Sequence, residues 1–342
     1  MQLDLPSAPP ITLSVVVPVY SGADYLAALI AEIERVRTGW SDSGAPLRLV
    51  EAILVDDAAV DSSPEIADQL AHEMEWVTVI HLARNFGQHP ATIAGILNTS
   101  GDWVVTLDED LQHPPARIED MLRIAVRDGH DIVYANPQSP VHQSRMRDFG
   151  SRLYKRLMQS VTGNSQIASF NSFRLVRGSI ARAASSVCGH DTYFDVSLSW
   201  FTQRVATLPM DLKDQRYIRT KSSGYNFSSL VSHARRMLMS SGARVMRSAS
   251  FLGLLFVGIS MVSGLGLVLY HLLYEPTSVV VRGWSSLILA VVFCSGFIIF
   301  LLGIVLEYLA LLVLHAHGKP IFFIADRQSD AILVDYFSKR QP

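Results

Sequence analysis

Cysteine is scarce in this sequence of 342 residues, and the scarcity excludes two kinds of architecture. The two cysteines, Cys188 and Cys294, lie far apart and lack the spacing of metal ligands, so neither a disulfide framework nor a zinc site is indicated. A G-x-G-x-x-G pattern is also missing after the first expected strand, which argues against a dinucleotide-dependent oxidoreductase. The N-terminus has neither the basic nor the apolar segment of a secretory signal peptide, so we expect none.

Formal charge is missing from two long stretches in the C-terminal part of the chain. Hydrophobic residues make up 49% of the sequence, which is high for a purely soluble protein. Residues 251–274 carry no formal charge, and residues 285–314 carry only Glu307, for which we favour a structural role. Each stretch is long enough to cross a hydrocarbon core of about 30 Å. We therefore expect two transmembrane helices within residues 251–314.

Basic residues flank these two stretches and predict their orientation. Lys319 and Arg327 follow the second stretch, whereas residues 275–284 between the two stretches hold only Arg282. The arginines ahead of the first stretch are Arg235, Arg236, Arg244 and Arg247. The positive-inside rule then predicts a protein of the plasma (inner) membrane with both termini in the cytosol. Residues 226–250 have the pattern of an amphipathic juxtamembrane helix on anionic lipid, although a plain basic flank explains them equally well.

Strand and helix patterns alternate in the first half of the chain. The β-prone runs lie at residues 11–17, 49–55, 77–81, 103–107 and 132–135, with helical patterns at about 25–33, 88–97 and 115–126. Continuous apolar strands separated by helices predict an α/β, Rossmann-like cytosolic domain with a mostly parallel sheet, over residues 1–225. In the tail, residues 315–342, two short β-prone runs at 321–324 and 331–337 predict a small hairpin that joins another subunit's sheet.

The fourth expected strand ends in the most informative motif of the chain. Asp108 and Asp110 follow this strand and precede the Pro114-Pro115 pair, which stops it. In an open α/β sheet, ligands bind beyond the carboxyl ends of the strands. Two hard oxygen ligands at that place suit Mg²⁺ or Mn²⁺, which bind through carboxylates together with substrate phosphates. We therefore expect a substrate that carries a diphosphate.

Three neighbouring strand ends carry groups that suit a nucleotide. Asp56 and Asp57 close the second strand, where they can accept hydrogen bonds from a base or a ribose. Tyr20 follows the first strand and offers an aromatic face for stacking on a base. Arg84 follows the third strand and can pair with phosphate oxygens. Taken singly, each has an ordinary explanation as a turn or surface residue, but together they predict a nucleotide site.

These motifs together resemble those of family 2 glycosyltransferases of the GT-A fold, and more narrowly those of the polyprenyl-phosphate (dolichol-phosphate type) glycosyltransferases. The segments that carry the resemblance are residues 15–20 (V-V-V-P-V-Y), 55–57 (V-D-D), 84–88 (R-N-F-G-Q), 107–115 (L-D-E-D-L-Q-H-P-P), 172–175 (S-F-R-L), 219–225, 303–308 and 318–320. The resemblance covers nearly the whole chain.

The resemblance implies a role for each matching residue. It implies that the divalent metal is held by Asp108, Asp110 and Gln112. The implied nucleotide-binding residues, with Arg84 added from its position after the third strand, are Pro18, Tyr20, Asp56, Asp57 and Arg84. The implied catalytic set is Asp108, Asp110, Arg174 and Arg219, the two arginines lying near the lipid phosphate and Arg216 being a rival of Arg219. A homotetramer is the assembly that the resemblance favours, and no nucleic-acid partner is expected.

The chain also departs from the family pattern. Ala58 and Ala59 stand where a glycine and a serine usually follow the two aspartates, and Glu109 replaces a small residue between the metal ligands. After the fifth strand, Asn136 and Pro137 stand where the family usually has a glycine and then an arginine.

We expect an inverting transferase that moves a sugar from a nucleotide-diphosphate sugar to a polyprenyl phosphate on the cytosolic membrane face. A lipid phosphate is already an anionic nucleophile, so the enzyme must position it and stabilise the leaving group. The competing hypothesis is a membrane-anchored scaffold that binds a nucleotide sugar but has no activity. The retained metal ligands favour the enzyme over this scaffold. A processive polysaccharide synthase needs more spans and a Q-x-x-R-W motif that the chain lacks.

Overall fold

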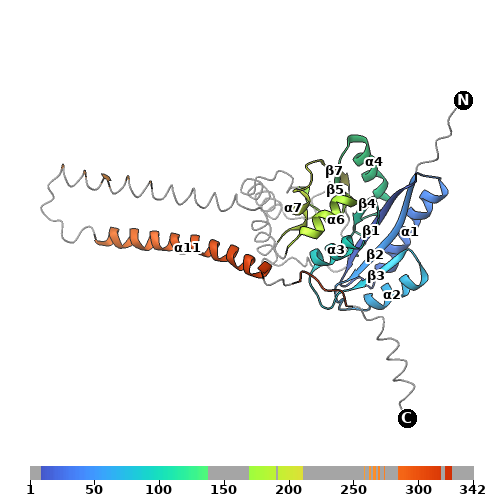
Figure 1. The fold of residues 1–342 in the computed structure, drawn as a ribbon, viewed down its shortest axis with the longest axis horizontal. Helices are drawn as coiled ribbons and strands as arrows, with labels where there is room; N and C mark the ends of the chain where they lie inside the picture. The colour runs from blue at the N-terminus through green and yellow to red at the C-terminus, as the bar shows by residue number, and fades with distance from the viewer. Residues whose placement is uncertain are drawn as a thin grey trace, which may run out of the picture.

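A seven-stranded sheet forms the centre of the N-terminal domain (Figure 1). The structure is a computed structural model that describes residues 9–137, 169–189, 192–210, 284–316 and 320–325, together with the helical residues 258, 262, 265, 266, 269 and 273. The strands lie in the order β3-β2-β1-β4-β6-β5-β7. They are β1 (Ile11–Val19), β2 (Leu47–Asp56), β3 (Val77–His81), β4 (Trp103–Thr106), β5 (Ile132–Pro137), β6 (Arg174–Arg177) and β7 (Val205–Met210).

The sheet is mostly parallel, as the sequence predicts. Only β6 runs against its neighbours β4 and β5, and the other pairings are parallel. Arg174 at the start of β6 pairs with Thr106 at the end of β4. The reversed direction of β6 therefore brings the residues just before it, including Ser172, to the edge where β4 delivers Asp108.

Helices cover both faces of the sheet and divide the core into two clusters. The helices are α1 (Leu26–Asp42), α2 (Ser63–Glu73), α3 (Gln88–Leu97), the 3-10 turn η1 (Pro115–Arg117), α4 (Ile118–Asp128), α6 (Gly178–Val187), α7 (Phe194–Leu198) and α11 (Trp284–Ala316). One cluster joins the sheet to α1, α2 and α4, and the other joins it to α3, α6 and α7. Alternate residues of β1 serve the two clusters, with Val15 and Val17 on one face and Val16 on the other.

Helix α3 packs closely against the sheet because Gly95 faces the strands. A Cβ atom on Gly95 would lie 2.4 Å from Cγ1 of Val16 and 2.9 Å from Cγ2 of Val55. Residues on α3 from Ala91 to Ile96 are buried in this contact. The close approach fixes the N-terminal end of α3, where Gln88 lies.

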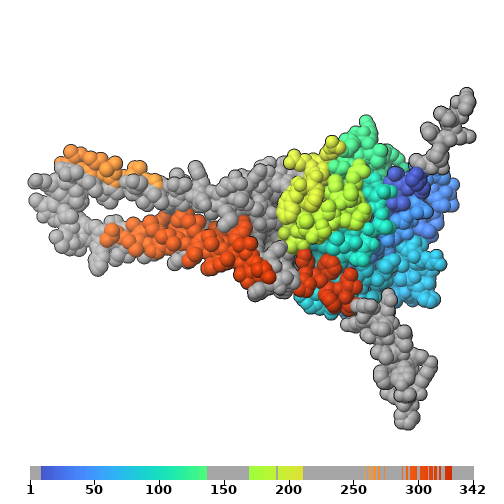
Figure 2. All heavy atoms as spheres, in the orientation of Figure 1, coloured from blue at the N-terminus to red at the C-terminus, as the bar shows by residue number. Residues whose placement is uncertain are grey.

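Helix α11 projects away from the sheet, as Figures 1 and 2 show. It has 33 residues, and residues 293–310 are apolar enough to cross a membrane by length and composition. Large apolar side chains along it are exposed, including Leu287, Ile298 and Leu312. Within the described residues α11 is the single helix of this kind. The first expected span and the expected juxtamembrane helix, residues 226–250, lie almost wholly outside the described residues.

The segment that follows α11 returns to the domain and pairs with the end of the sheet's outer strand. The N–H of Ala325 donates to the carbonyl of His81 (2.9 Å), and the N–H of Ala83 donates to the carbonyl of Phe323 (3.0 Å). Ile324 and Leu82 form an antiparallel bridge. The sequence predicted a hairpin that joins another subunit's sheet; residues 321–324 instead pair within their own chain. The second run of that hairpin, residues 331–337, lies outside the described residues.

Replacement of Gly95 by alanine tests the close packing of α3. Gly95→Ala should lower the free energy of unfolding by about 1 to 2 kcal/mol, because the strain of overpacking exceeds the gain in helix propensity. Gly39→Ala is the matched control, since Gly39 lies inside α1 with nothing within 4 Å of its added Cβ, and it should be neutral or stabilising. Thermal unfolding of the full chain in detergent measures both. Equal effects of the two substitutions would contradict the packing argument.

Candidate active site

The carboxylate of Asp108 is held from two sides at the end of β4. Gln88 Nε2 donates to its Oδ1 (2.6 Å), and Ser172 Oγ donates to its Oδ2 (2.8 Å). The backbone N–H of Asp108 donates to Nδ1 of His113 (2.9 Å), whose ring stacks on Phe173 at 5.0 Å between centroids. Side chains from α3, from the β6 approach and from the following turn thus fix one carboxylate at the strand end.

Asp110 and Gln112 form a hydrogen-bonded pair after Asp108 in the same motif. Gln112 donates its backbone N–H to Oδ1 of Asp110 (3.2 Å) and its side-chain amide to Oδ2 (2.8 Å). The residue between them, Leu111, has a φ of 62°, in the left-handed region that is costly for a side chain other than glycine. This turn folds the motif back so that its second acid and its glutamine meet. Backbone strain of this kind concentrates at functional sites.

Glu109, the unusual middle residue of the motif, holds the loop after β1. Its carboxylate accepts hydrogen bonds from the backbone N–H groups of Tyr20 (2.8 Å) and Ser21 (3.1 Å). A Cβ at Gly22 would lie 2.7 Å from Oε2 of Glu109, so glycine permits this approach. Tyr20 is 41% exposed at the tip of the loop, whereas Pro18 is buried within β1. The third carboxylate of the motif therefore positions the loop that carries the predicted base-stacking tyrosine.

The two aspartates at the end of β2 hold neighbouring loops in place. Asp57 accepts hydrogen bonds from the backbone N–H groups of Phe86 (2.7 Å) and Gly87 (2.8 Å). Burial raises the pKa of Asp57, although these two donors oppose the rise. Asp56 accepts from the N–H of Ala59 (2.7 Å) and contacts Nδ1 of His81 (2.8 Å). Their contact with a nucleotide stays a prediction.

Arg84 lies on the loop that Asp57 holds. Its guanidinium group stacks over the ring of Phe86, 4.0 Å from the ring centroid, and Nη1 donates to the carbonyl of Asn85 (3.1 Å). The side chain is exposed, and no described acidic side chain forms an ion pair with it. The predicted phosphate contact is therefore open to this residue.

Residues 14–183 match the family model described as Glycosyl transferase family 2. This range runs from β1 to α6 and includes every strand end described above. These residues form a glycosyltransferase family 2 domain.

Relatives of this family resemble the chain over most of its length. An uncharacterized glycosyltransferase of Synechocystis sp. is 26% identical over 92% of this chain and 95% of its own. An undecaprenyl-phosphate 4-deoxy-4-formamido-L-arabinose transferase of Klebsiella pneumoniae is 28% identical over 92% of this chain and 94% of its own. Among solved structures, glucosyl-3-phosphoglycerate synthase of Mycobacterium tuberculosis has a TM-score of 0.48 at 14% identity, covering 69% of this chain and 80% of that one.

Arg174, which family resemblance assigns to the lipid phosphate, lies inside the domain. Its side chain is 3% exposed and pairs with the buried carboxylate of Asp195. The hydroxyl group of Tyr134 donates to the same carboxylate (2.9 Å). Contact between Arg174 and a substrate would require this buried pair to open. Its predicted companion Arg219, and Arg216 as the rival of Arg219, lie outside the described residues.

Sequence reasoning missed three residues that hold Asp108: Gln88, Ser172 and His113. Gln88 and Ser172 belong to segments that carry the family resemblance, but no local pattern predicts that both reach the same carboxylate. His113 stands within the motif itself, and only its spacing from Asp108 hinted at a contact.

The donor set at this family 2 site fits a divalent cation that the substrate helps to bind. The described residues contain no group of three or more histidine, cysteine, aspartate or glutamate side chains arranged around a metal position. Asp108 and Asp110 supply hard carboxylate oxygens at the same strand end. Mg²⁺ characteristically binds one or two carboxylates and completes its shell with waters and substrate phosphates. Two carboxylates and the amide of Gln112 meet that requirement.

Ala58, which replaces the usual family glycine, adopts a glycine-like conformation. Its φ of 51° lies in the left-handed region, which costs a residue with a Cβ about 1 to 2 kcal/mol. Ala58→Gly removes this strain, but glycine also gives the unfolded chain more conformational entropy, which favours unfolding. The net effect should be a rise in the free energy of unfolding of about 0.5 to 1 kcal/mol. Ala59→Gly, without a positive φ to relieve, should lower it by a similar amount. Measuring the free energy of unfolding of both variants in detergent tests this prediction. Stabilisation by Ala59→Gly would contradict the argument.

His81 makes the stability of the domain depend on pH. The hydrogen bond that His81 donates to the carboxylate of Asp56 raises the pKa of His81 above its ordinary 6.5; burial opposes the rise, and Asp68 adds to it. A raised folded-state pKa means that the stabilisation is complete below the unfolded-state pKa and is lost as the pH rises through the folded-state pKa. The unfolding temperature should fall over that range in the wild type, and less so in His81→Asn. Parallel pH profiles for the two proteins would refute the role of His81.

Proposed function

We propose that this protein is an inverting glycosyltransferase that moves a sugar from a nucleotide-diphosphate sugar to a polyprenyl phosphate at the cytosolic face of the membrane. The single observation that carries the proposal is the Asp108 carboxylate, fixed by Gln88 and Ser172 at the carboxyl end of β4 with the Asp110–Gln112 pair beside it. Relatives named as undecaprenyl-phosphate sugar transferases align with over nine tenths of the chain and support the acceptor class.

The proposed reaction needs little acid–base catalysis from the protein. The acceptor phosphate is anionic at neutral pH, so its oxygen can attack the anomeric carbon as the bond to the nucleoside diphosphate breaks. Attack from the side opposite the leaving group inverts the anomeric configuration. Asp195 is buried against Arg174 and Tyr134, so it serves the structure and does not act as a base. The residues of the site are needed to align two anionic reactants.

The cofactor in this proposal is Mg²⁺ or Mn²⁺, held by Asp108, Asp110 and Gln112. Such an ion, when bound, neutralises charge on the departing diphosphate. Gln88 and Ser172 keep the Asp108 carboxylate in one orientation. The strained left-handed backbone at Leu111 keeps Asp110 and Gln112 together. Tyr20 lies on a loop held by Glu109, and its ring would stack on the base.

The exposed apolar surface of α11 supports a membrane location. A helix of 33 residues is about 50 Å long, and the large apolar side chains of Leu287, Ile298 and Leu312 are exposed along it. Lipid covers such a surface at the lowest free energy. We keep the two-span arrangement, with the catalytic domain and both termini in the cytosol, as part of the proposal, and a homotetramer as its expected assembly.

The alternative function is a membrane-anchored scaffold that binds a nucleotide sugar without turnover. The observation that favours it is the altered segment after β2, where Ala58 holds a strained conformation in place of glycine. The intact arrangement around Asp108 favours the enzyme.

An assay with the purified full chain separates the two. The protein in detergent is incubated with Mn²⁺ or Mg²⁺, undecaprenyl phosphate and a panel of nucleotide sugars that includes a 4-deoxy-4-formamido-L-arabinose donor, and released nucleoside diphosphate is measured. We expect lipid-dependent release from one donor, reduced about a hundredfold or more in Asp110→Asn, because metal-assisted charge stabilisation is worth several kcal/mol. Asp128→Asn, an exposed aspartate at the end of α4, is the matched control.

Two outcomes would count against the enzyme. Release that does not depend on lipid would remove the acceptor from the proposal. Metal-dependent binding of a nucleotide sugar, with no release from any donor, would favour the scaffold.

A further inference from the structure

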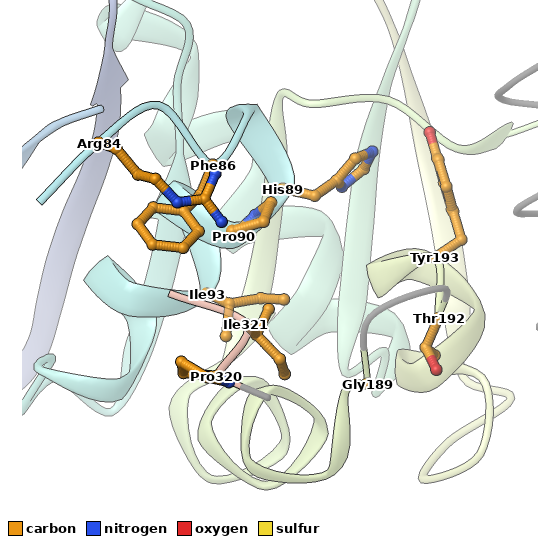
Figure 3. Close-up of a pocket in the computed structure, with 10 residues that line it drawn as sticks. All are labelled: Arg84, Phe86, His89, Pro90, Ile93, Gly189, Thr192, Tyr193, Pro320 and Ile321. Carbon is orange, nitrogen blue, oxygen red and sulfur yellow. The ribbon is translucent and has the colours of Figure 1, made fainter. Parts of the chain in front are cut away.

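A pocket lies in the seam between the domain and the segment that follows α11 (Figure 3). Its walls come from the loop after β3 and α3, from the approach to α7, and from the returning segment. The residues that line it are Arg84, Phe86, His89, Pro90, Ile93, Gly189, Thr192, Tyr193, Pro320 and Ile321. Arg84 and Phe86 stand at one end, Thr192 and Tyr193 stand at the other, and Ile93 and Ile321 lie between them.

The returning segment is fastened so that it closes one side of this pocket. Its backbone pairs with residues 81–83 through the two hydrogen bonds described above. Phe322 packs against the core cluster that contains α3 and α7. Pro320 and Ile321 are thereby held over the pocket, four and five residues after the last residue of α11. The pocket therefore lies beside the domain end of the apolar helix.

Two walls of the pocket lie close in the chain to residues that donate hydrogen bonds to the carboxylate of Asp108. Gln88, which lies between the lining residues Phe86 and His89, donates to Oδ1 of Asp108. The ring of Tyr193 stacks on Phe170, with 6.1 Å between centroids, and Ser172, two residues further on, donates to Oδ2. The pocket thus adjoins the centre at which the sugar would be transferred.

The lining of the pocket suits an amphiphilic anion. Arg84 supplies one positive charge, oriented by its stacking on Phe86. The other walls combine apolar side chains, including Pro320 and Ile321, with a larger exposed polar surface, and they include the edge-to-face pair of His89 and Tyr193, with 4.5 Å between ring centroids. A guanidinium group binds phosphate oxygens through directed N–H donors, and apolar side chains favour a hydrocarbon tail. A free nucleotide would leave the apolar wall unused.

We propose that this seam pocket binds the phosphate end of the polyprenyl phosphate, with Arg84 on the phosphate and Pro320 and Ile321 against the first isoprene units. The inference rests on the proposed function and deepens it by assigning the acceptor's place. It moves Arg84 from the nucleotide, where the sequence placed it, to the acceptor. It also makes the segment after the apolar helix a part of the acceptor site.

Separate Michaelis constants for the two substrates test the assignment. Arg84→Gln should raise the KM for undecaprenyl phosphate about tenfold or more, through loss of a charge-assisted hydrogen bond, and leave the KM for the nucleotide sugar within about twofold. Arg123→Gln, an exposed arginine on α4, is the matched control. A rise in the nucleotide-sugar KM with an unchanged lipid KM would return Arg84 to the nucleotide and overturn the proposal.

The apolar wall is tested by a pair of substitutions on the same segment. Ile321→Ser should raise the KM for the lipid, whereas Phe323→Ser should not, because Phe323 is 60% exposed and does not line the pocket. Thermal unfolding of each variant checks that the segment stays docked. Equal lipid KM values for Ile321→Ser and the wild type would contradict the assigned wall.

A photoactivatable prenyl phosphate provides a readout that does not depend on turnover. The probe should label residues 189–193 or 320–325 of the full chain in detergent, and undecaprenyl phosphate should compete. Competition by inorganic phosphate alone, or equally by phosphatidic acid, would overturn the polyprenyl assignment, as would labelling confined to other segments. Because labelling needs no donor sugar, a chain that labels here but shows no lipid-dependent release would refute the proposed transfer and leave the pocket assignment standing.

Discussion

The hydrogen bonds that hold the carboxylate of Asp108 connect the separate parts of this site. Gln88 reaches it from α3, and Ser172 reaches it from the strand that runs against the sheet. Each donor depends on other contacts: α3 is pressed on the sheet at Gly95, and the β6 approach is held by Thr106, whose hydroxyl group donates to the carbonyl of Ser172. A shift of either layer would turn the carboxylate. The orientation of the Asp108 carboxylate therefore depends on the packing of both layers.

The remaining acids at the strand ends serve mainly to hold backbone in place. Asp57 holds the loop of Arg84, Asp56 holds the turn at Ala59, and Glu109 holds the loop of Tyr20. Each satisfies backbone N–H groups that the loops would otherwise leave without partners. These carboxylates thus fix three loops in place, so that the loops can support a ligand. In the proposed function, a divalent cation would offset the negative charge gathered at this edge.

The sequence predicted the parallel strands and the position of the acids well, because both leave local signals. The predicted bounds of β3 and α3, residues 77–81 and 88–97, agree with the structure. Strand β6 was recognised only as a motif, since four residues with an arginine at each end carry no clear alternation. The pairing of Arg174 with Asp195, and of Ile324 with Leu82, joins residues far apart in sequence. Such contacts are decided by tertiary packing, which a local pattern cannot encode.

In the proposed function, the returning segment would bring the lipid acceptor to the centre at which the water-soluble donor binds. The acceptor cannot leave the bilayer far, because each buried CH₂ group holds it there by about 0.8 kcal/mol. The proposed wall, residues 320–321, follows α11 in the chain and would keep the acceptor site at the membrane end of the domain. The pairing of the returning segment with residues 81–83 would then fix that site relative to Asp108.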